Sequence, residues 1–314
     1  MTHAALVTRK LPSSVLSQLS TVADVDLYAG EAAIPADELR ARVADKDALV
    51  CLLTDAVDRT VIDAAPKLKV IANVAVGYNN IDVAYARSRG IVVTNTPDVL
   101  TESVADFTWA LILAITRRLS EGERLVRRGE WKGWAFDLLL GSELRGKQLG
   151  LLGVGRIGRA VAARASAFGV RVAYTSRREI DFPGAEAMPL DRLLLTSDVV
   201  SLHVPLTPDT RHLIDKRALT RMKRSAYLIN TARGPVVDEA ALAWALQHHL
   251  LAGAALDVYE HEPAVHPDLL SLENVLLVPH LASGTTETRT AMADLAVGNV
   301  VAVLEGRTPL TPVI

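Results

Sequence analysis

The chain has 314 residues, of which 50% are hydrophobic and only 4% aromatic, and its formal net charge is −2. This length suggests two domains, and the small net charge argues against nucleic acid as a partner. The start of the chain lacks the apolar segment of a secretory signal, and the apolar run 109–115 is too short to span a bilayer. A single cysteine, Cys51, excludes a disulfide within the chain. We therefore expect a cytoplasmic protein without membrane contact.

The first third of the chain alternates short apolar runs with helical patterns. Strands are expected at residues 4–8, 25–28, 48–53, 68–74 and 91–94, and helices at residues 12–19, 36–43, 60–65 and 83–89. Such alternation predicts a parallel sheet covered on both faces. A long apolar helix follows at residues 102–119, which we expect to be buried or in a subunit interface. Residues 130–146 then predict an irregular arm that carries Trp131 and Trp134.

A second α/β pattern occupies residues 148–280. Its six expected strands are residues 148–152, 172–174, 199–202, 226–230, 253–256 and 275–278, a number that suits a dinucleotide-binding sheet. A last helix at residues 286–305 and a tail at 308–314 are expected to return to the first domain. The predicted fold class is α/β, with two doubly wound parallel-sheet domains. We expect a Rossmann domain (97–285) that is inserted into a flavodoxin-like domain (1–96 plus 286–314).

The motif Gly153-Val154-Gly155-Arg156-Ile157-Gly158 lies between an expected strand and an expected helix. In this context the first glycine makes a tight turn, the second admits a pyrophosphate, and the third allows helix and strand to pack closely. The helix N-terminus then offers unpaired N–H groups to the phosphates. A glycine-rich turn without a ligand is the alternative. We expect Gly153, Gly155, Arg156, Ile157 and Gly158 to bind a dinucleotide.

The residues after the second strand of this domain indicate which dinucleotide binds. NAD enzymes carry a carboxylate there for the ribose 2′-OH, whereas this chain has Ser176-Arg177-Arg178 and no carboxylate before Glu179. Arginine binds phosphate well, so we predict that NADP(H) is preferred and NAD(H) possible. The alternative is that these arginines belong to a solvated turn.

Ionisable residues follow three consecutive strands, where open α/β sheets bind ligands. Reduction of a ketone needs a proton, and histidine is the usual donor, so we assign this role to His280. Glu262 beside it would favour the imidazolium, and Arg233 would polarise the carbonyl and hold a carboxylate. Asp257 would accept a hydrogen bond from the nicotinamide carboxamide. The alternatives are a structural histidine at 280 and an ordinary surface carboxylate at 262.

Further cofactor contacts are expected at other strand and helix ends. These are Thr101, His203, Val204, Pro205, Thr231 and Ala232. His248 and His249 fall on a helix and are expected to be solvated. No histidine or cysteine cluster has the spacing of metal ligands, so we predict no metal.

Together these segments resemble the D-isomer-specific 2-hydroxyacid dehydrogenase family over essentially the whole chain. The matching segments are residues 76–82, 95–106, 153–158, 230–234, 257–263 and 279–283. The resemblance implies that Arg233, Glu262 and His280 are the catalytic trio. It implies that Val76 and Gly77 bind the substrate carboxylate through backbone N–H groups, and we place Ser283 beside them. It also implies a homodimer through the helix and arm, about 101–146, and a lid role for the outer domain.

Within that family, residues 95–102 and 283–289 are most similar to hydroxy(phenyl)pyruvate reductases and glyoxylate/hydroxypyruvate reductases. Relatives that oxidise phosphoglycerate commonly have an arginine where Asn73 and Val74 stand. Many glyoxylate reductases have an arm tryptophan just before the glycine that matches Gly141, where this chain has Leu140. The substrate can therefore be larger than glyoxylate, and aryl pyruvates and sugar-derived 2-keto acids stay open.

The predicted function is an NADPH-preferring reductase that converts small 2-keto acids, such as hydroxypyruvate, glyoxylate or hydroxyphenylpyruvate, into D-2-hydroxy acids. One alternative is an NAD-dependent D-2-hydroxyacid or phosphoglycerate dehydrogenase that works oxidatively. An alternative of another class is a nucleotide-sensing corepressor without catalysis. The intact trio argues against the corepressor, because a sensor needs no proton donor.

Overall fold

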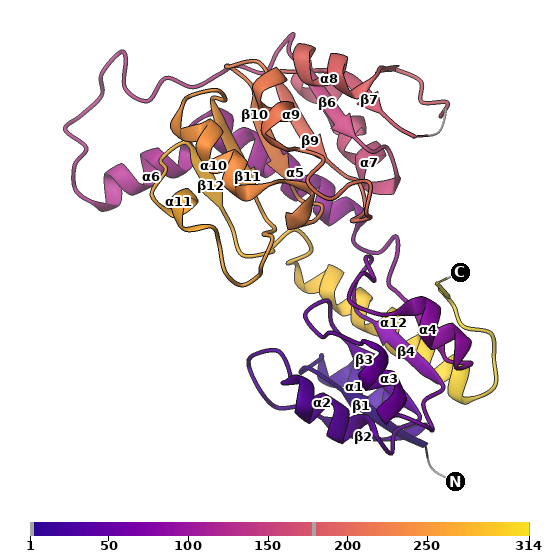
Figure 1. Cartoon of the computed structure of the whole chain (residues 1–314). Coiled ribbons are helices and arrows are strands. Elements are labelled where there is room, and N and C mark those ends of the chain that lie inside the picture. Colours follow the sequence, from indigo (N-terminus) through magenta and orange to yellow (C-terminus); the bar gives the residue numbers. More distant parts are fainter. Residues whose placement is uncertain (1–2, 178–179, 314) are drawn as a thin grey trace. The chain divides into compact units, whose positions relative to one another are not determined.

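The computed structural model describes residues 3–177 and 180–313, and the chain in it divides into two compact units (Figure 1). Residues 1–100 and 285–314 form unit 1, and residues 101–284 form unit 2. Each unit is built around its own parallel sheet. Within the described ranges, no helix is both long and apolar enough to cross a membrane.

Unit 1 contains a five-stranded parallel sheet in the order β2-β1-β3-β4-β5. This is the flavodoxin-like order, and it confirms the predicted fold class. The strands are β1 (His3–Val7), β2 (Ala23–Leu27), β3 (Ala48–Cys51), β4 (Val70–Asn73) and β5 (Val92–Thr94). The helices are α1 (Ser13–Leu19), α2 (Ala36–Val43), α3 (Arg59–Ala64), α4 (Val83–Ser88) and α12 (Thr286–Leu304).

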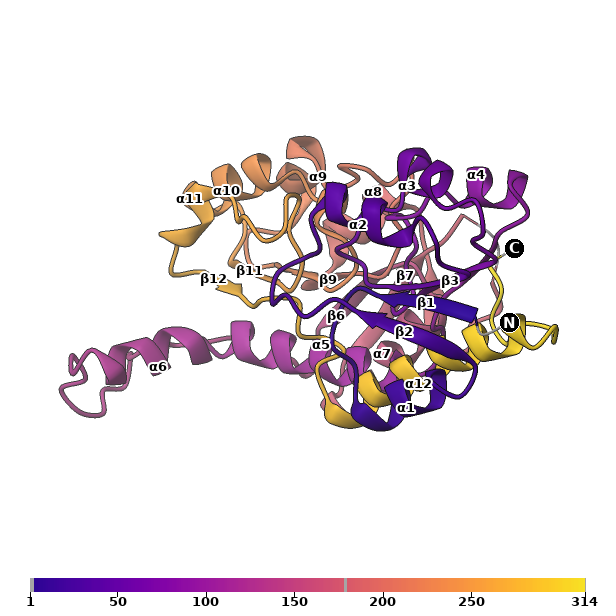
Figure 2. The same ribbon diagram turned by 90° about the horizontal axis from the view of Figure 1, so that it is seen from below.

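The helices of unit 1 cover both faces of its sheet, as the apolar runs required. α1 packs with α12, which also contacts β3 and β4, while α2 packs with α3. Figure 2 shows α2 and α3 on one side of β1 and β2, with α1 and α12 on the other. The C-terminal tail pairs with the edge strand, because Val313 N donates to Val93 O at 2.8 Å and Pro312 bridges Thr94. The tail therefore protects the exposed edge of β5.

Unit 2 contains a seven-stranded parallel sheet in the order β12-β11-β10-β9-β6-β7-β8. The strands are β6 (Gln148–Leu152), β7 (Arg171–Thr175), β8 (Ala185–Ala187), β9 (Val199–Leu202), β10 (Tyr227–Asn230), β11 (Gly253–Leu256) and β12 (Val275–Leu277). The strand order reverses between β6 and β9, so their carboxyl ends mark the switch point where ligands bind in this class of fold. The six strands expected from the sequence are present. The seventh, β8, was missed because its three residues are partly exposed and lack an apolar run.

The remaining elements of unit 2 cover its sheet in two layers. α5 packs on α7, β10 and β11, while α9 packs on α8 and α10. The helices are α5 (Thr101–Thr116), α6 (Leu119–Arg127), α7 (Arg156–Ala165), α8 (Leu190–Thr196), α9 (Lys216–Arg221), α10 (Glu239–Gln247) and α11 (Pro267–Leu270), with short 3-10 turns η1 (Ser166–Phe168) and η2 (Gly234–Val236).

The long helix expected at residues 102–119 is interrupted in the structure. α5 ends at Thr116, and Arg118 adopts a left-handed conformation (φ 53°) before α6 begins. The chain returning from the arm helps to end α5, because Ser142 N donates to Thr116 O at 2.7 Å. A Cβ on Gly141 would lie 2.4 Å from the same oxygen, so only glycine fits there. The expectation of burial is confirmed for α5, whereas α6 has no buried residue.

Candidate cofactor and active site

The glycine turn connects β6 to α7, as expected. Gly153 has a φ of 95°, and a Cβ there would lie 2.8 Å from the carbonyl oxygen of His203. A Cβ on Gly158 would lie 2.3 Å from Gly153 O, which shows how closely the helix packs on the turn. A Cβ on Gly155, by contrast, would meet no atom within 4 Å. The first and third glycines are thus required by packing, and the second leaves the backbone open to a ligand.

This open backbone suits a dinucleotide. Gly155 precedes the ten-residue helix α7, and both Gly155 and Arg156 are exposed, whereas Ile157 is half-buried. The amides of a first helical turn have no intrahelical acceptor and lie at the positive end of the dipole. An accessible set of such amides is a ready anion site. The turn therefore fits the pyrophosphate of a nicotinamide dinucleotide.

The loop after β9 borders this turn. Val204 Cγ1 would lie 3.0 Å from a Cβ on Gly153, Pro205 is exposed, and His203 Nε2 lies 2.9 Å from Ser201 Oγ. Burial lowers the pKa of His203 from 6.5 to about 4. The imidazole of His203 is therefore uncharged at neutral pH, and its expected contact with the cofactor stays a prediction.

Ser176 and Arg177 emerge at the carboxyl end of β7, the strand that pairs with β6. Both residues are exposed. Arg177 Nη1 lies 3.9 Å from Asp209 Oδ2, and both side chains are largely in solvent. Arg178, the third residue expected here, lies outside the described residues.

His280 and Glu262 come together at the carboxyl ends of β11 and β12. His280 Nδ1 lies 2.9 Å from Glu262 Oε2 and 3.2 Å from Oε1. Glu262 Oε1 also accepts a hydrogen bond from Tyr259 N at 3.1 Å. The His280 and Glu262 side chains are 26% and 28% exposed. The imidazole is thus held through Nδ1 but is still reachable from solvent.

Arg233 follows β10, the neighbour of β11. Its Nη1 donates to Ala232 O at 2.7 Å. Burial lowers the pKa of Arg233 and the charge of Glu262 opposes this, and a guanidinium starting from such a high value stays charged. Gly234 brings the two loops into contact, because a Cβ there would lie 1.8 Å from the carbonyl carbon of Tyr259. Arg233 is therefore close enough to Glu262 for their charges to interact.

Opposing effects set the ionisation of Glu262. Burial raises the pKa of this carboxyl, but the hydrogen bond and charge of His280, the amide of Tyr259 and the charge of Arg233 together lower it below its ordinary value. Glu262 is therefore ionised at neutral pH. A negative charge therefore faces Nδ1 of the His280 ring.

Asp257 holds the backbone of the loop that carries His280. Its side chain is fully buried, and its two carboxylate oxygens accept hydrogen bonds from Leu281 N and Ala282 N. His280 N donates to Asp257 O at 2.9 Å, and His280 itself has a positive φ of 54°. Sequence reasoning missed this positioning role, although a charged residue directly after a buried strand was a signal for it. The expected contact with the carboxamide stays a prediction.

The other expected cofactor residues lie at the same edge of the unit 2 sheet or at the start of α5. The hydroxyl of Thr231, which is buried, lies 3.1 Å from the hydroxyl of Thr108 on α5. Ala232 N donates to Asn230 Oδ1 at 3.0 Å. Thr101 begins α5 and is half-buried, and Ser283 is half-buried beside Ala282.

In unit 1, side-chain amides hold the loop of Val76 and Gly77. Asn95 Nδ2 donates to Val76 O at 2.7 Å, and Asn73 Nδ2 donates to Gly77 O at 2.9 Å. Asn80 Nδ2 in turn donates to Leu52 O at 3.0 Å. These asparagines were missed as positioning residues, although Asn73 interrupts an apolar run. The carbonyls of the loop are fixed, while Val76 and Gly77 remain partly exposed.

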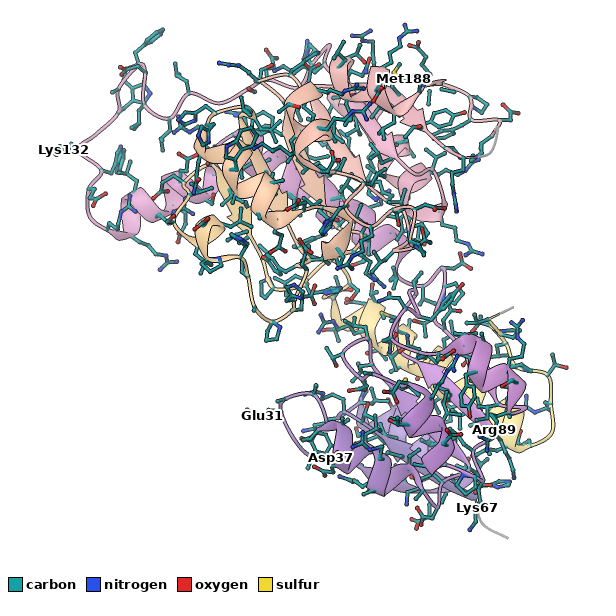
Figure 3. The ribbon with its side chains drawn as sticks, in the orientation of Figure 1. Glu31, Asp37, Lys67, Arg89, Lys132 and Met188 are labelled. Carbon is teal, nitrogen blue, oxygen red and sulfur yellow. The ribbon has the colours of Figure 1, made fainter. Side chains whose placement is uncertain are left out.

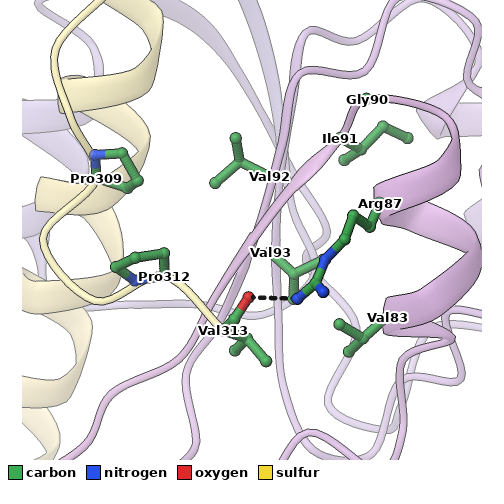
Figure 4. Close-up of a pocket in the computed structure, with 9 residues that line it drawn as sticks. All are labelled: Val83, Arg87, Gly90, Ile91, Val92, Val93, Pro309, Pro312 and Val313. Atoms are coloured by element: carbon green, nitrogen blue, oxygen red, sulfur yellow. Dashed lines mark hydrogen bonds between the residues drawn. The ribbon is translucent and has the colours of Figure 1, made fainter.

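A separate cavity of about 310 Å³ lies in unit 1 (Figure 4). It is bounded by α4, β5 and the C-terminal tail, and Arg87 Nη2 donates to Val313 O at 3.3 Å beside it. None of the expected site residues lines this cavity. Across the described part of the chain, no group of three or more His, Cys, Asp or Glu residues could hold a metal ion.

Known proteins are similar to this chain in sequence and in fold. The family model of the D-isomer specific 2-hydroxyacid dehydrogenase, NAD binding domain, matches residues 109–282. A glyoxylate reductase from Thermofilum pendens is 51% identical over 312 residues, covering 96% of this chain and 92% of its own length. One from Korarchaeum cryptofilum is 50% identical, covering 98% of this chain and 95% of its own.

A solved structure extends the comparison to three dimensions. The NADPH-dependent glyoxylate/hydroxypyruvate reductase from Sinorhizobium meliloti, in complex with NADP and malonate, matches with a TM-score of 0.91 at 40% identity, covering 100% of this chain and 97% of that one. The resemblance inferred from the motifs is confirmed. The chain belongs to the D-isomer specific 2-hydroxyacid dehydrogenase family and is an NAD(P)-dependent oxidoreductase.

Proposed function

We propose that the protein reduces small 2-keto acids to D-2-hydroxy acids and prefers NADPH. The contact between His280 Nδ1 and Glu262 at 2.9 Å carries this proposal, because it supplies a proton donor held in one orientation. Relatives of similar length are named glyoxylate reductases, and one solved relative is an NADPH-dependent glyoxylate/hydroxypyruvate reductase. Both support a 2-keto acid as substrate.

Each residue of the trio has one task in this proposal. The bound nicotinamide supplies the hydride. His280 gives its Nε2 proton to the developing alkoxide, because Nδ1 is engaged by Glu262. Glu262 is ionised and sustains the imidazolium until the proton is transferred. Arg233 keeps its charge near the carbonyl and binds the substrate carboxylate.

Unit 2 is the cofactor domain in this proposal, and unit 1 is the substrate-binding (lid) domain. Within unit 1, the backbone N–H groups of Val76 and Gly77 would bind the substrate carboxylate. Within unit 2, Arg233 and Ser283 would bind the substrate. Two contacts support this. Asn95 Nδ2 donates to Val76 O, which shares its peptide plane with the N–H of Gly77, and Thr96 N donates to Ala75 O at 2.9 Å, which shares its plane with the N–H of Val76. A fixed set of donors binds an anion without reorganisation.

A substrate panel tests the function directly. Glyoxylate, hydroxypyruvate, 4-hydroxyphenylpyruvate and 2-ketogluconate are each assayed with NADPH and with NADH by the loss of absorbance at the dihydronicotinamide band. We expect turnover of at least one keto acid and a higher kcat/KM with NADPH. Absence of turnover with every pair, in a protein that binds NADPH, would overturn the proposal.

The cofactor preference is expected to shift toward NADH when aspartate replaces Ser176 and alanine replaces Arg177. In a Ser176→Asp, Arg177→Ala variant, the introduced carboxylate would repel a 2′-phosphate and accept a hydrogen bond from a ribose hydroxyl. Charge-assisted hydrogen bonds contribute about 1.5–3 kcal/mol. We therefore expect the ratio of kcat/KM for NADPH over NADH to fall about 10- to 100-fold.

An exposed arginine on α9 supplies the matched control for that variant. Arg217→Ala removes the same kind of side chain from another part of unit 2 and should leave the ratio unchanged. A Ser176→Asp, Arg177→Ala variant with the native ratio would refute the assignment of these residues to the 2′-phosphate.

We also propose that the chain forms a homodimer through α5, α6 and the arm. The arm extends from α6, with Lys132 labelled on it in Figure 3, and it exposes large apolar side chains. Trp131 is 54%, Trp134 83% and Phe136 84% exposed. Several large apolar side chains exposed on one short segment favour an interaction site, and a second copy of the chain offers a self-complementary surface.

Light scattering after size exclusion tests the assembly. One chain has a mass of 33.8 kDa, so a dimer has twice that, about 68 kDa. We expect this mass for the native chain and the monomer mass for a Trp134→Asp, Phe136→Asp variant. A native chain that elutes as a monomer at micromolar concentration would rule out the dimer.

A further inference from the structure

A buried carboxylate clamps the loop that carries Glu262. Glu239, the first residue of α10, is 4% exposed. Its Oε1 accepts a hydrogen bond from Glu260 N at 2.7 Å, and its Oε2 accepts one from His266 N at 3.2 Å. These two amides lie on either side of Glu262 in the chain. One carboxylate therefore fixes both ends of the segment 260–266.

Glu260 binds Glu239 in return. Glu260 Oε1 accepts a hydrogen bond from Glu239 N at 3.0 Å, and Glu260 Oε2 lies 2.9 Å from His212 Nε2. A buried carboxylate costs free energy unless hydrogen-bond donors surround it. Burial raises the pKa of Glu239, and the amides of Glu260 and His266 oppose the rise only in part. The carboxylate of Glu239 therefore depends on the amides of Glu260 and His266. If the loop moved away, the carboxylate would be buried without hydrogen-bond donors.

Gly234, the residue after Arg233, packs against the same loop. A Cβ on Gly234 would lie 2.4 Å from Glu260 N and 1.8 Å from the carbonyl carbon of Tyr259. Tyr259 N in turn donates to Glu262 Oε1 at 3.1 Å. The backbone on the N-terminal side of Glu262 is thus held between η2 and α10. Little freedom remains for the carboxylate that meets His280.

We propose that Glu239 is a positioning residue that acts through Glu262, because its carboxylate holds the segment 260–266 in the register that directs Glu262 at His280. The inference deepens the proposed function, on which its kinetic consequences rest. Glu239 touches neither substrate nor cofactor in this scheme. Its effect is transmitted by the backbone of the loop.

A double-mutant cycle separates positioning from general stability. In Glu239→Gln the side chain keeps one acceptor oxygen, but its NH2 group faces one of the two backbone N–H groups. That hydrogen bond is therefore lost, because both groups are donors. We expect kcat for keto acid reduction to fall about 10- to 100-fold, since small displacements of catalytic groups have effects of this size. In a Glu262→Gln background the same substitution should cost less than about twofold, because the group it positions is already gone. Equal losses in both backgrounds would overturn the inference, as would an unchanged kcat in folded Glu239→Gln protein.

Two further variants serve as a control and as a substitute in this cycle. Asp198→Asn is the matched control, because Asp198 also has a largely buried carboxylate that accepts a backbone N–H, from Gln148 at 2.9 Å, at the opposite end of the sheet. It should leave kcat within about twofold of native. If Glu239→Gln does not fold, Glu260→Gln takes its place in the cycle. This substitution weakens the hydrogen bond that Glu260 accepts from Glu239 N.

A measurement without turnover keeps this inference distinct from the proposed function. In protein labelled with ¹⁵N-histidine, the ring signals of His280 are identified by their absence from His280→Asn. We expect Glu239→Gln to move the Nδ1 signal of His280 toward its position in Glu262→Gln, and Asp198→Asn to leave it in place. An unmoved signal would overturn the inference. Absence of keto acid reduction in the native enzyme would overturn the proposed function alone, because the Nδ1 signal still decides the role of Glu239.

Discussion

Replacement of His280 by asparagine is expected to lower kcat for 2-keto acid reduction by about 10²- to 10⁴-fold, the contribution of a positioned general acid. Asparagine is the informative substitute because His280 has a φ of 54°, a conformation that asparagine tolerates better than most residues. The backbone of the loop is then preserved while the proton donor is lost. Stopped-flow or steady-state assays with saturating NADPH measure the effect.

The chain offers a matched control for this substitution. His249 also has a positive φ, of 50°, and is exposed just after α10, not on the helix as the sequence led us to expect. His249→Asn should therefore retain native kcat. The dissociation constant for NADPH should be the same in both variants, because neither side chain is assigned to the cofactor. Near-native turnover by His280→Asn would remove His280 from the mechanism.

Replacement of Arg233 by lysine is expected to lower kcat/KM by about 10³-fold. Lysine keeps the positive charge but lacks the planar fork that can bind a carboxylate through two donors. Loss of one donor to a developing oxyanion costs about 10²- to 10³-fold in kcat, and a weaker grip on the substrate carboxylate raises KM further. Initial rates over a range of keto acid concentrations separate the two contributions.

Arg171→Lys is the control for this variant. Arg171 is exposed at the amino end of β7, on the edge of the sheet opposite to the site. We expect its kinetic constants to match those of the native enzyme. If Arg233→Lys raised KM for NADPH rather than for the keto acid, the guanidinium would belong to the cofactor site and not to the substrate.

Local patterns were enough to predict most of the elements and the place of the glycine turn. The buried runs of β3, β4 and β6 lie wholly inside their sheets, and Gly153 and Gly158 occupy positions where any Cβ would collide with backbone. Such features depend on a few neighbouring residues, so they can be recognised in the sequence. Where the signal was weak, the prediction failed. The strand β8 has only three residues, and the break at Arg118 depends on Gly141 and Ser142, which return from the arm.

Local patterns along the chain specify the alternation of strands and helices, the dinucleotide turn and the ionisable residues at the strand ends. Contacts between distant elements bring Nδ1 of His280 to Glu262, the carboxylate of Asp257 to the amides of Leu281 and Ala282, and the carboxylate of Glu239 to the amide of Glu260. No local pattern could predict these contacts, and all of them have the same cause. These contacts join residues from different elements, and the distance between their atoms is set by the parallel register of β10, β11 and β12 and by the packing of α10, not by any local periodicity.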